Sequence, residues 1–262
     1  MPSPTSTRPT LLKRVFALLL TFTAGVVDIV GYLSLYHTFT AHMTGTTVHL
    51  GNSLVSGRWP EAMFAGTVVV AFVVGSIIGR TIIEIGARRH FRSIASITLA
   101  LEALLLLAFI PLAIHSLATH GSGESSYMTA PLLAMLAAAM GLQTATLTRV
   151  GPLTVHTTFV TGMFNKLAQL ISHLLFETYA LHRAVPARKA HYRGLREVSA
   201  ARAKFIAGIW LLYVSGAVAG SLLEKNVGPS ALYLSITLLA CAIAVDYIRP
   251  LSLEEEKDQS ER

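Results

Sequence analysis

Charged residues are scarce in this sequence. They make up 13% of its 262 residues, against about 25% in an ordinary soluble domain, while 53% of the residues are hydrophobic. A soluble protein of this length needs more charge than that to cover its surface. A nucleic-acid-binding protein would not combine a net charge of +7 with so apolar a chain. The composition therefore excludes both classes and predicts that lipid surrounds most of the chain.

Cysteine is nearly absent, and so are the motifs of common enzymes. The single cysteine, Cys241, excludes an internal disulfide and a metal site built from several cysteines. The sequence has no phosphate loop, no His-Glu-x-x-His motif and no nucleophile–base pairing. No soluble domain is large enough to bind ATP, and the apolar regions hold no His-x-x-x-His pair. We therefore expect no enzyme, no cofactor and no metal site.

Long apolar runs, in contrast, are plentiful. A membrane helix needs about 20 largely apolar residues. Five stretches are long enough to cross and a sixth, the last, is somewhat shorter: 15–35, 62–79, 94–114, 128–147, 205–223 and 231–247. Two further segments, 42–56 and 158–181, carry polar side chains along their length. The sequence predicts an all-α integral membrane protein with about six transmembrane helices plus two polar re-entrant or broken helices.

Basic residues mark the side that we expect to face the cytoplasm. They cluster before residue 15, at 80–92 and in the loop 183–204, whereas 115–127 has no Lys or Arg. An even number of crossings must separate clusters on one side, which favours six. We expect both termini to lie in the cytoplasm. The loop 183–204 is expected to contact anionic lipid head groups.

Two series of residues recur in the same order along the chain. The first series is Gly25, Asp28, Thr44, Gly45, Gly75 and Gly79; the second is Gly141, Thr144, Thr161, Gly162, Gly216 and Gly220. The sequence therefore divides into a cytoplasmic tail (1–14), a first repeat (15–127), a second repeat (128–248) and an acidic disordered tail (249–262). If each repeat crosses three times, the second is inverted relative to the first, a plan that recurs in secondary transporters.

The first series also carries a family resemblance. Gly25-x-x-Asp28 followed by Phe39-Thr-Ala-His-Met-Thr-Gly45 resembles the YoaK-like family of bacterial multi-pass membrane proteins, whose opening motif is Gly-x-x-Asp followed by Met-Thr-Gly-Asn. The Thr-Thr-x-x-Thr-Gly162 echo is similar to the same family, so the likeness covers nearly all of the chain except its tails. The sequence departs at Thr46, where the family usually has Asn. This is a domain of unknown function. The resemblance therefore implies a multi-pass protein of the bacterial cytoplasmic (inner) membrane, and it implies no substrate.

Asp28 is the most informative polar residue within a span. It lies about 20 Å into the first span at 1.5 Å per residue, near the middle of the bilayer, where a carboxylate needs a partner, a proton or water. We expect a proton- or solute-binding site there, with these residues: Asp28, Tyr32, His42, Thr44, Gly45, Thr161, Gly162 and Asn165. The alternative is a structural hydrogen-bond knot between helices. Glu102 is either a second proton carrier or a protonated packing residue.

The leading functional hypothesis is a secondary transporter or permease for a small solute, with proton coupling left open. The alternative is a non-transporting membrane scaffold or sensor subunit, and a channel comes third. The partners expected are the lipid bilayer and a small solute or proton, with no nucleic acid. The sequence leaves the oligomeric state open, a homo-oligomer included.

Overall fold

The computed structural model describes residues 11–35, 38–120, 129–146, 149–150, 153–154, 160–248 and 250. Its elements are α1 (Leu11–Ser34), α2 (Met43–Val55), α3 (Trp59–Arg88), α4 (Ile94–His120), α5 (Thr129–Thr146), β1 (Arg149–Val150), β2 (Leu153–Thr154), α6 (Val160–Arg183), α7 (Pro186–Val227), the 3-10 turn η1 (Gly228–Ala231) and α8 (Leu232–Ile248). The two short strands pair with each other. The predicted helical membrane fold is confirmed.

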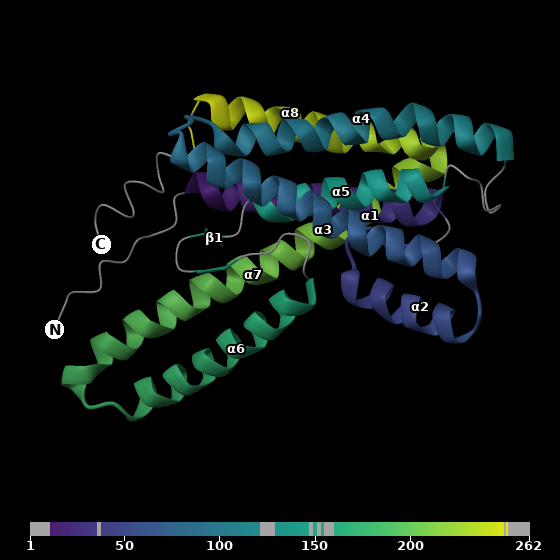
Figure 1. Cartoon of the computed structure of the whole chain (residues 1–262). Coiled ribbons are helices and arrows are strands. Elements are labelled where there is room, and N and C mark those ends of the chain that lie inside the picture. Colours follow the sequence, from purple (N-terminus) through teal and green to yellow (C-terminus); the bar gives the residue numbers. More distant parts are fainter. Residues whose placement is uncertain are drawn as a thin grey trace.

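The long helices pack side by side, and α2 and α6 lie outside them (Figure 1). The main contacts join α3 to α5, α1 to α7, and α4 to both α5 and α8. In contrast, α2 packs chiefly on α3, and α6 packs on α7. Figure 1 places the start of α1, the α3–α4 turn, the α6–α7 turn and the end of α8 toward the same end of the molecule.

Among the described residues, five segments are long and apolar enough to cross a membrane: 11–34, 59–88, 94–119, 129–146 and 186–248. The last of these holds both α7 and α8. Many large apolar side chains of the bundle are exposed, among them Val70, Leu104 and Leu222. Water would make such a surface costly, whereas lipid is its natural solvent.

Two boundaries differ from those expected from the sequence. Residues 11–14, assigned to a tail, form the first turn of α1. Residues 186–204, assigned to a basic loop, are the first half of α7, a helix of 42 residues. This segment is rich in Ala, Arg and Lys, which favour helix, and Pro186 stands in its first turn, where proline is tolerated. Most of its residues are exposed, and the segment is a helix and not a loop.

Glycines allow close helix packing at two crossings. Between α1 and α7, a Cβ on Gly25 would overlap the carbonyl oxygen of Tyr213, and one on Gly216 would overlap that of Phe22. Between α5 and α3, a Cβ on Gly141 would overlap the carbonyl oxygen of Phe72, and a Cβ on Gly75 that of Ala138. Each backbone therefore approaches its partner as closely as only glycine permits.

Candidate functional site

Asp28 belongs to α1 and is buried in the protein, with 2% of its surface exposed. It stands six residues before the last residue of α1, which is about 9 Å along the helix axis. A carboxylate in this position must be satisfied by the protein, and five hydrogen bonds reach it from two other parts of the chain.

The first group of donors lies in the connector 38–42, between α1 and α2. The Asp28 Oδ1 atom accepts hydrogen bonds from the Thr40 amide at 3.1 Å, the Thr40 hydroxyl at 3.2 Å and the Ala41 amide at 3.1 Å. Because these amides reach Asp28 well before the end of α1, the chain turns back alongside α1 before α2 begins. The connector therefore packs against the side of α1.

His42 contacts the buried carboxylate and is itself partly exposed. Its Nδ1 atom lies 2.6 Å from Asp28 Oδ2, while 38% of its side chain is exposed. The hydrogen bond with Asp28 raises the pKa of His42 above its usual value. His42 also immediately precedes α2, and its side chain makes no capping hydrogen bond to that helix.

Tyr213 of α7 is the donor from the other half of the chain, and sequence reasoning missed it. Its hydroxyl donates to Asp28 Oδ2 at 2.6 Å, across 185 residues of sequence. The available signal was its place in an apolar stretch, three residues before Gly216 of the second glycine pair. Asp28 thus joins α1, the connector and α7.

An aromatic stack covers the connector. The rings of Tyr32 and Phe39 are stacked with their centroids 4.4 Å apart, and the Phe39 and His42 rings lie 4.9 Å apart. Tyr32, expected near Asp28, therefore contributes by packing on the connector.

The Thr-Gly pair of α2 points away from the carboxylate. Thr44 and Gly45 are exposed, and the buried neighbour is Thr46. The Thr46 hydroxyl is within hydrogen-bond distance of the Phe39 carbonyl (3.3 Å) and the His42 carbonyl (3.1 Å). Thr46, at the position where the resemblance implied Asn, therefore ties the first turn of α2 to the connector.

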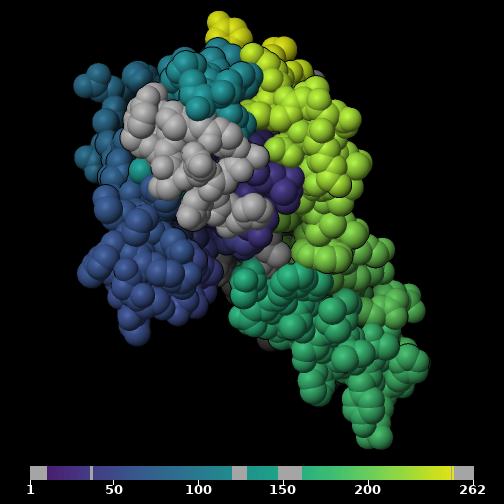
Figure 2. All heavy atoms as spheres, turned by 90° about the vertical axis from the view of Figure 1, so that its right-hand side faces the viewer, coloured from purple at the N-terminus to yellow at the C-terminus, as the bar shows by residue number. Residues whose placement is uncertain are grey.

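The corresponding residues of α6 lie on a different part of the surface. Thr161 and Asn165 are exposed and Gly162 is half-buried, whereas Met163 between them packs into the core. Figure 2 shows α2 and α6 as separate projections. In the described part of the chain, no hydrogen bond joins these α6 residues to Asp28. A cavity that both Thr-Gly segments share with Asp28 stays a prediction.

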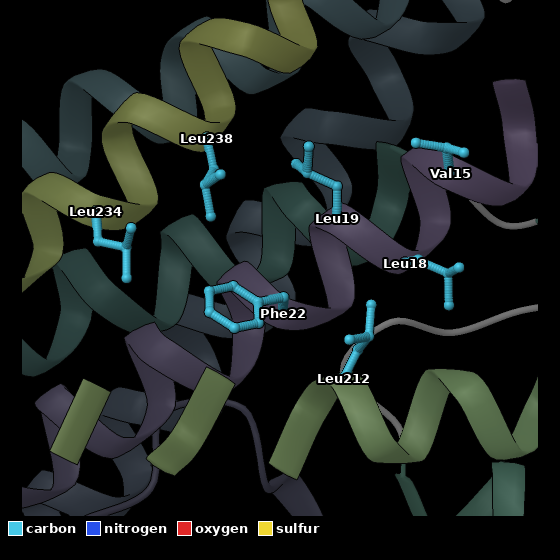
Figure 3. A pocket seen from close by; sticks show the side chains of 7 residues that line it. All are labelled: Val15, Leu18, Leu19, Phe22, Leu212, Leu234 and Leu238. Carbon is cyan, nitrogen blue, oxygen red and sulfur yellow. The ribbon is translucent and has the colours of Figure 1, made fainter. Parts of the chain in front are cut away.

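A groove between α1, α7 and α8 differs in character from the Asp28 site. Its lining is entirely apolar, as Figure 3 shows: Val15, Leu18, Leu19, Phe22, Leu212, Leu234 and Leu238. Such a lining offers a polar solute no hydrogen bond, and it suits lipid chains instead. Among the described residues, no three potential metal ligands come together.

A bundle of long apolar helices around a buried carboxylate defines a multi-pass membrane protein. Residues 16–245 match the family described as "Protein of unknown function (DUF1275)", and the chain belongs to this family. It is similar to the UPF0700 transmembrane protein YoaK of Bacillus subtilis (strain 168), with 32% identity over 158 residues, which is 60% of this chain and 67% of that protein. The resemblance seen in the sequence is therefore confirmed. No solved structure is a significant match to the chain.

Proposed function

We propose that the protein is a secondary transporter of a small solute, coupled to protons, with Asp28 as its proton-binding carboxylate. The observation that carries the proposal is the position of this group. Asp28 is buried, it holds the connector and α7 together, and its partner His42 is partly exposed. A proton therefore has a titratable group between the surface and the buried carboxylate, as in proton relays of transporters.

Protonation of Asp28 would act on one set of contacts more than on the other. The ionised carboxylate accepts from Thr40 and Ala41 through Oδ1, and from His42 and Tyr213 through Oδ2. A neutral acid keeps one accepting oxygen for the connector amides, but its O–H group cannot accept from both His42 and Tyr213 in the same way. Proton binding would thus loosen the link between α7 and the first half of the chain.

The matched glycine crossings support an inverted repeat. In this proposal α1, α3 and α4 cross the membrane in the first repeat, and α5, α7 and α8 cross it in the second. The segments that contain α2 and α6 re-enter from opposite sides, as in secondary transporters. In this proposal both termini lie in the cytoplasm of a bacterial cell and the protein lies in the cytoplasmic membrane, which the positions of the basic residues support. The basic first half of α7 would contact anionic lipid head groups.

The exposed polar faces of α2 and α6 are the proposed lining for the solute. Thr44 and Gly45 lie on one face, and Thr161, Gly162 and Asn165 lie on the other. Polar groups at membrane depth are tolerated only against protein or a water-filled cavity. Lining a shared passage would satisfy this requirement for both faces.

A non-transporting scaffold or sensor subunit is the second candidate, and one observation favours it. Both oxygens of Asp28 are already bonded within the protein. In a scaffold, the carboxylate would serve only to fix the connector against α7, and removing its charge would change stability and nothing else.

Asp28→Asn separates the two functions, because it keeps the shape of the side chain and removes its charge. Untargeted metabolite profiles would be compared between cells that lack the protein and cells that overproduce the original chain, Asp28→Asn or Glu84→Gln. Glu84 is an exposed carboxylate paired with Arg88 and serves as the control. We expect at least one small solute to change with the original chain and with Glu84→Gln, and not with Asp28→Asn at equal membrane abundance. A profile that Asp28→Asn leaves intact, or a loss fully explained by lower abundance, would favour the scaffold.

The membrane orientation has its own test. Single cysteines would be placed at Ser56 and at Gly194, both exposed, after Cys241→Ala has removed the exposed native thiol. The proposed orientation places Ser56 outside the cell and Gly194 in the cytoplasm. A maleimide that cannot cross membranes should label only Ser56→Cys in intact cells, and both after lysis. Labelling of both in intact cells would contradict the six-crossing arrangement.

A further inference from the structure

Glu102 of α4 is a buried acid that the proposed site does not use. Its side chain is fully buried, and neither carboxyl oxygen has a hydrogen-bond partner among the described residues. It belongs to the inward stripe of α4 that also contains Thr98, Leu106 and Phe109. An ionised carboxylate without a partner would be highly unfavourable there.

Gln143 of α5 has a buried acceptor atom that lacks a hydrogen-bond donor. Its Nε2 group donates to the carbonyl of Leu20 in α1, which fixes the orientation of the amide. Its Oε1 atom is buried and has no partner in the described part of the chain. A buried amide oxygen of this kind calls for a donor.

The helix register brings the two side chains to the same level. The hydroxyls of Thr98 and Thr146 lie 2.9 Å apart, and α4 and α5 run in opposite directions (Figure 1). Glu102 is four residues beyond Thr98 on the same face of α4, and Gln143 is three residues before Thr146 on the same face of α5. Antiparallel packing therefore makes Glu102 and Gln143 the next facing pair.

Among the described residues, the helices packed against α4 hold no buried cation that could take the place of a proton. In α5 there is no titratable side chain, and Asp246 of α8 is bonded to Ser96 at 2.6 Å. The exposed Arg88 of α3 pairs with Glu84, and Arg80 is exposed as well. The remaining titratable groups of α8 are also exposed: Tyr233, Cys241 and Tyr247.

We propose that Glu102 and Gln143 form a second buried proton-binding site. The neutral carboxyl group of Glu102 donates its O–H to Gln143 Oε1, while Gln143 Nε2 donates to the Leu20 carbonyl. A single proton then gives both the Glu102 carboxyl group and the Gln143 Oε1 atom a hydrogen-bond partner. The two hydrogen bonds link α4 through α5 to α1. This site is separate from Asp28, which lies eight residues beyond Leu20 and whose oxygens are already bonded.

Infrared spectroscopy of the purified protein at neutral pH tests the proposal without any solute. The original chain should show the carbonyl band of a neutral carboxylic acid, and Glu102→Gln should remove that band. Gln143→Met, which has similar size and no acceptor oxygen, should keep the band and shift it to higher frequency, because the hydrogen bond is lost. Glu84→Gln should change nothing in this region.

Two results would overturn the proposal. One is a spectrum in which Glu102→Gln removes no neutral-acid band; the other is a band that Gln143→Met leaves unshifted. If Glu102→Gln cannot be purified, the Gln143→Met shift decides alone. The result is independent of transport, because Asp28→Asn should leave the Glu102 band in place whether or not Asp28 proves to be a transport residue.

Discussion

The two glycine crossings have the same backbone packing and different chemistry. Between α1 and α7, Asp28 follows Gly25 by three residues, and Tyr213 precedes Gly216 by three. Between α5 and α3, the residues at the corresponding positions are Thr144 and Phe72. The close approach of the helices is thus common to both crossings, whereas the carboxylate–phenol hydrogen bond exists in one. The comparison indicates that the glycines build the bundle, whereas the pair Asp28 and Tyr213 gives one crossing a titratable site.

The largest effect should come from filling the space that both crossings need. Gly75→Ala and Gly216→Ala should each lower the free energy of unfolding by about 3 kcal/mol, since the new methyl group meets a backbone carbonyl that cannot rotate away. Thermal unfolding in detergent measures this. Gly194→Ala, in open space on α7, is the control and should gain up to about 1 kcal/mol. A loss at only one crossing would break the equivalence.

A smaller and one-sided effect should follow from the phenol. Tyr213→Phe removes a hydrogen bond to a buried carboxylate and should cost about 2 kcal/mol. The matched change at the other crossing is Phe72→Tyr. It adds a hydroxyl at a crossing that has Thr144 in place of the carboxylate. It should not stabilise the protein. Equal melting temperatures for Tyr213→Phe and the original chain would contradict the site as described.

The smallest effect should be a dependence on pH at His42. Because Asp28 raises the pKa of His42 in the folded protein, the pair contributes its stability fully below the usual histidine pKa of about 6.5. That contribution is lost as the pH rises through the raised value. The melting temperature of the original chain should therefore exceed that of His42→Ala most at acidic pH, and the difference should shrink at alkaline pH. His173→Ala, at an exposed position of α6, is the matched control.

Sequence reasoning found the half of the site that is local. Asp28 is conspicuous because a carboxylate inside a span needs a partner, and the polar segment 42–56 predicted both His42 and a helix close to the observed α2, Met43–Val55. The partner Tyr213 could not be found in this way. A tyrosine in an apolar span is ordinary, and the contact depends on how α7 packs on α1.

The Met-Thr-Gly motif also could not predict which residues of α2 face the interior of the protein. The motif predicted site roles for Thr44 and Gly45, whereas the neighbouring Thr46 makes the hydrogen bonds to the connector. Which face of α2 turns inward depends on tertiary contacts, among them the hydrogen bonds of the connector to Asp28 and the packing of α2 on α3. The same limit applies to Gln143, whose partner lies on α1.

The most direct test of the central claim is a distance measured across the link that Asp28 makes. Spin labels at Thr47 of α2 and Ser215 of α7, both exposed, would report on the two sides of the site in a Cys241→Ala background. The account predicts that Asp28→Asn moves this distance distribution to longer values or broadens it, because the hold on His42 and Tyr213 is weakened, while Glu84→Gln leaves it unchanged. Identical distributions for the original chain and Asp28→Asn would contradict a charge-dependent link between the two halves.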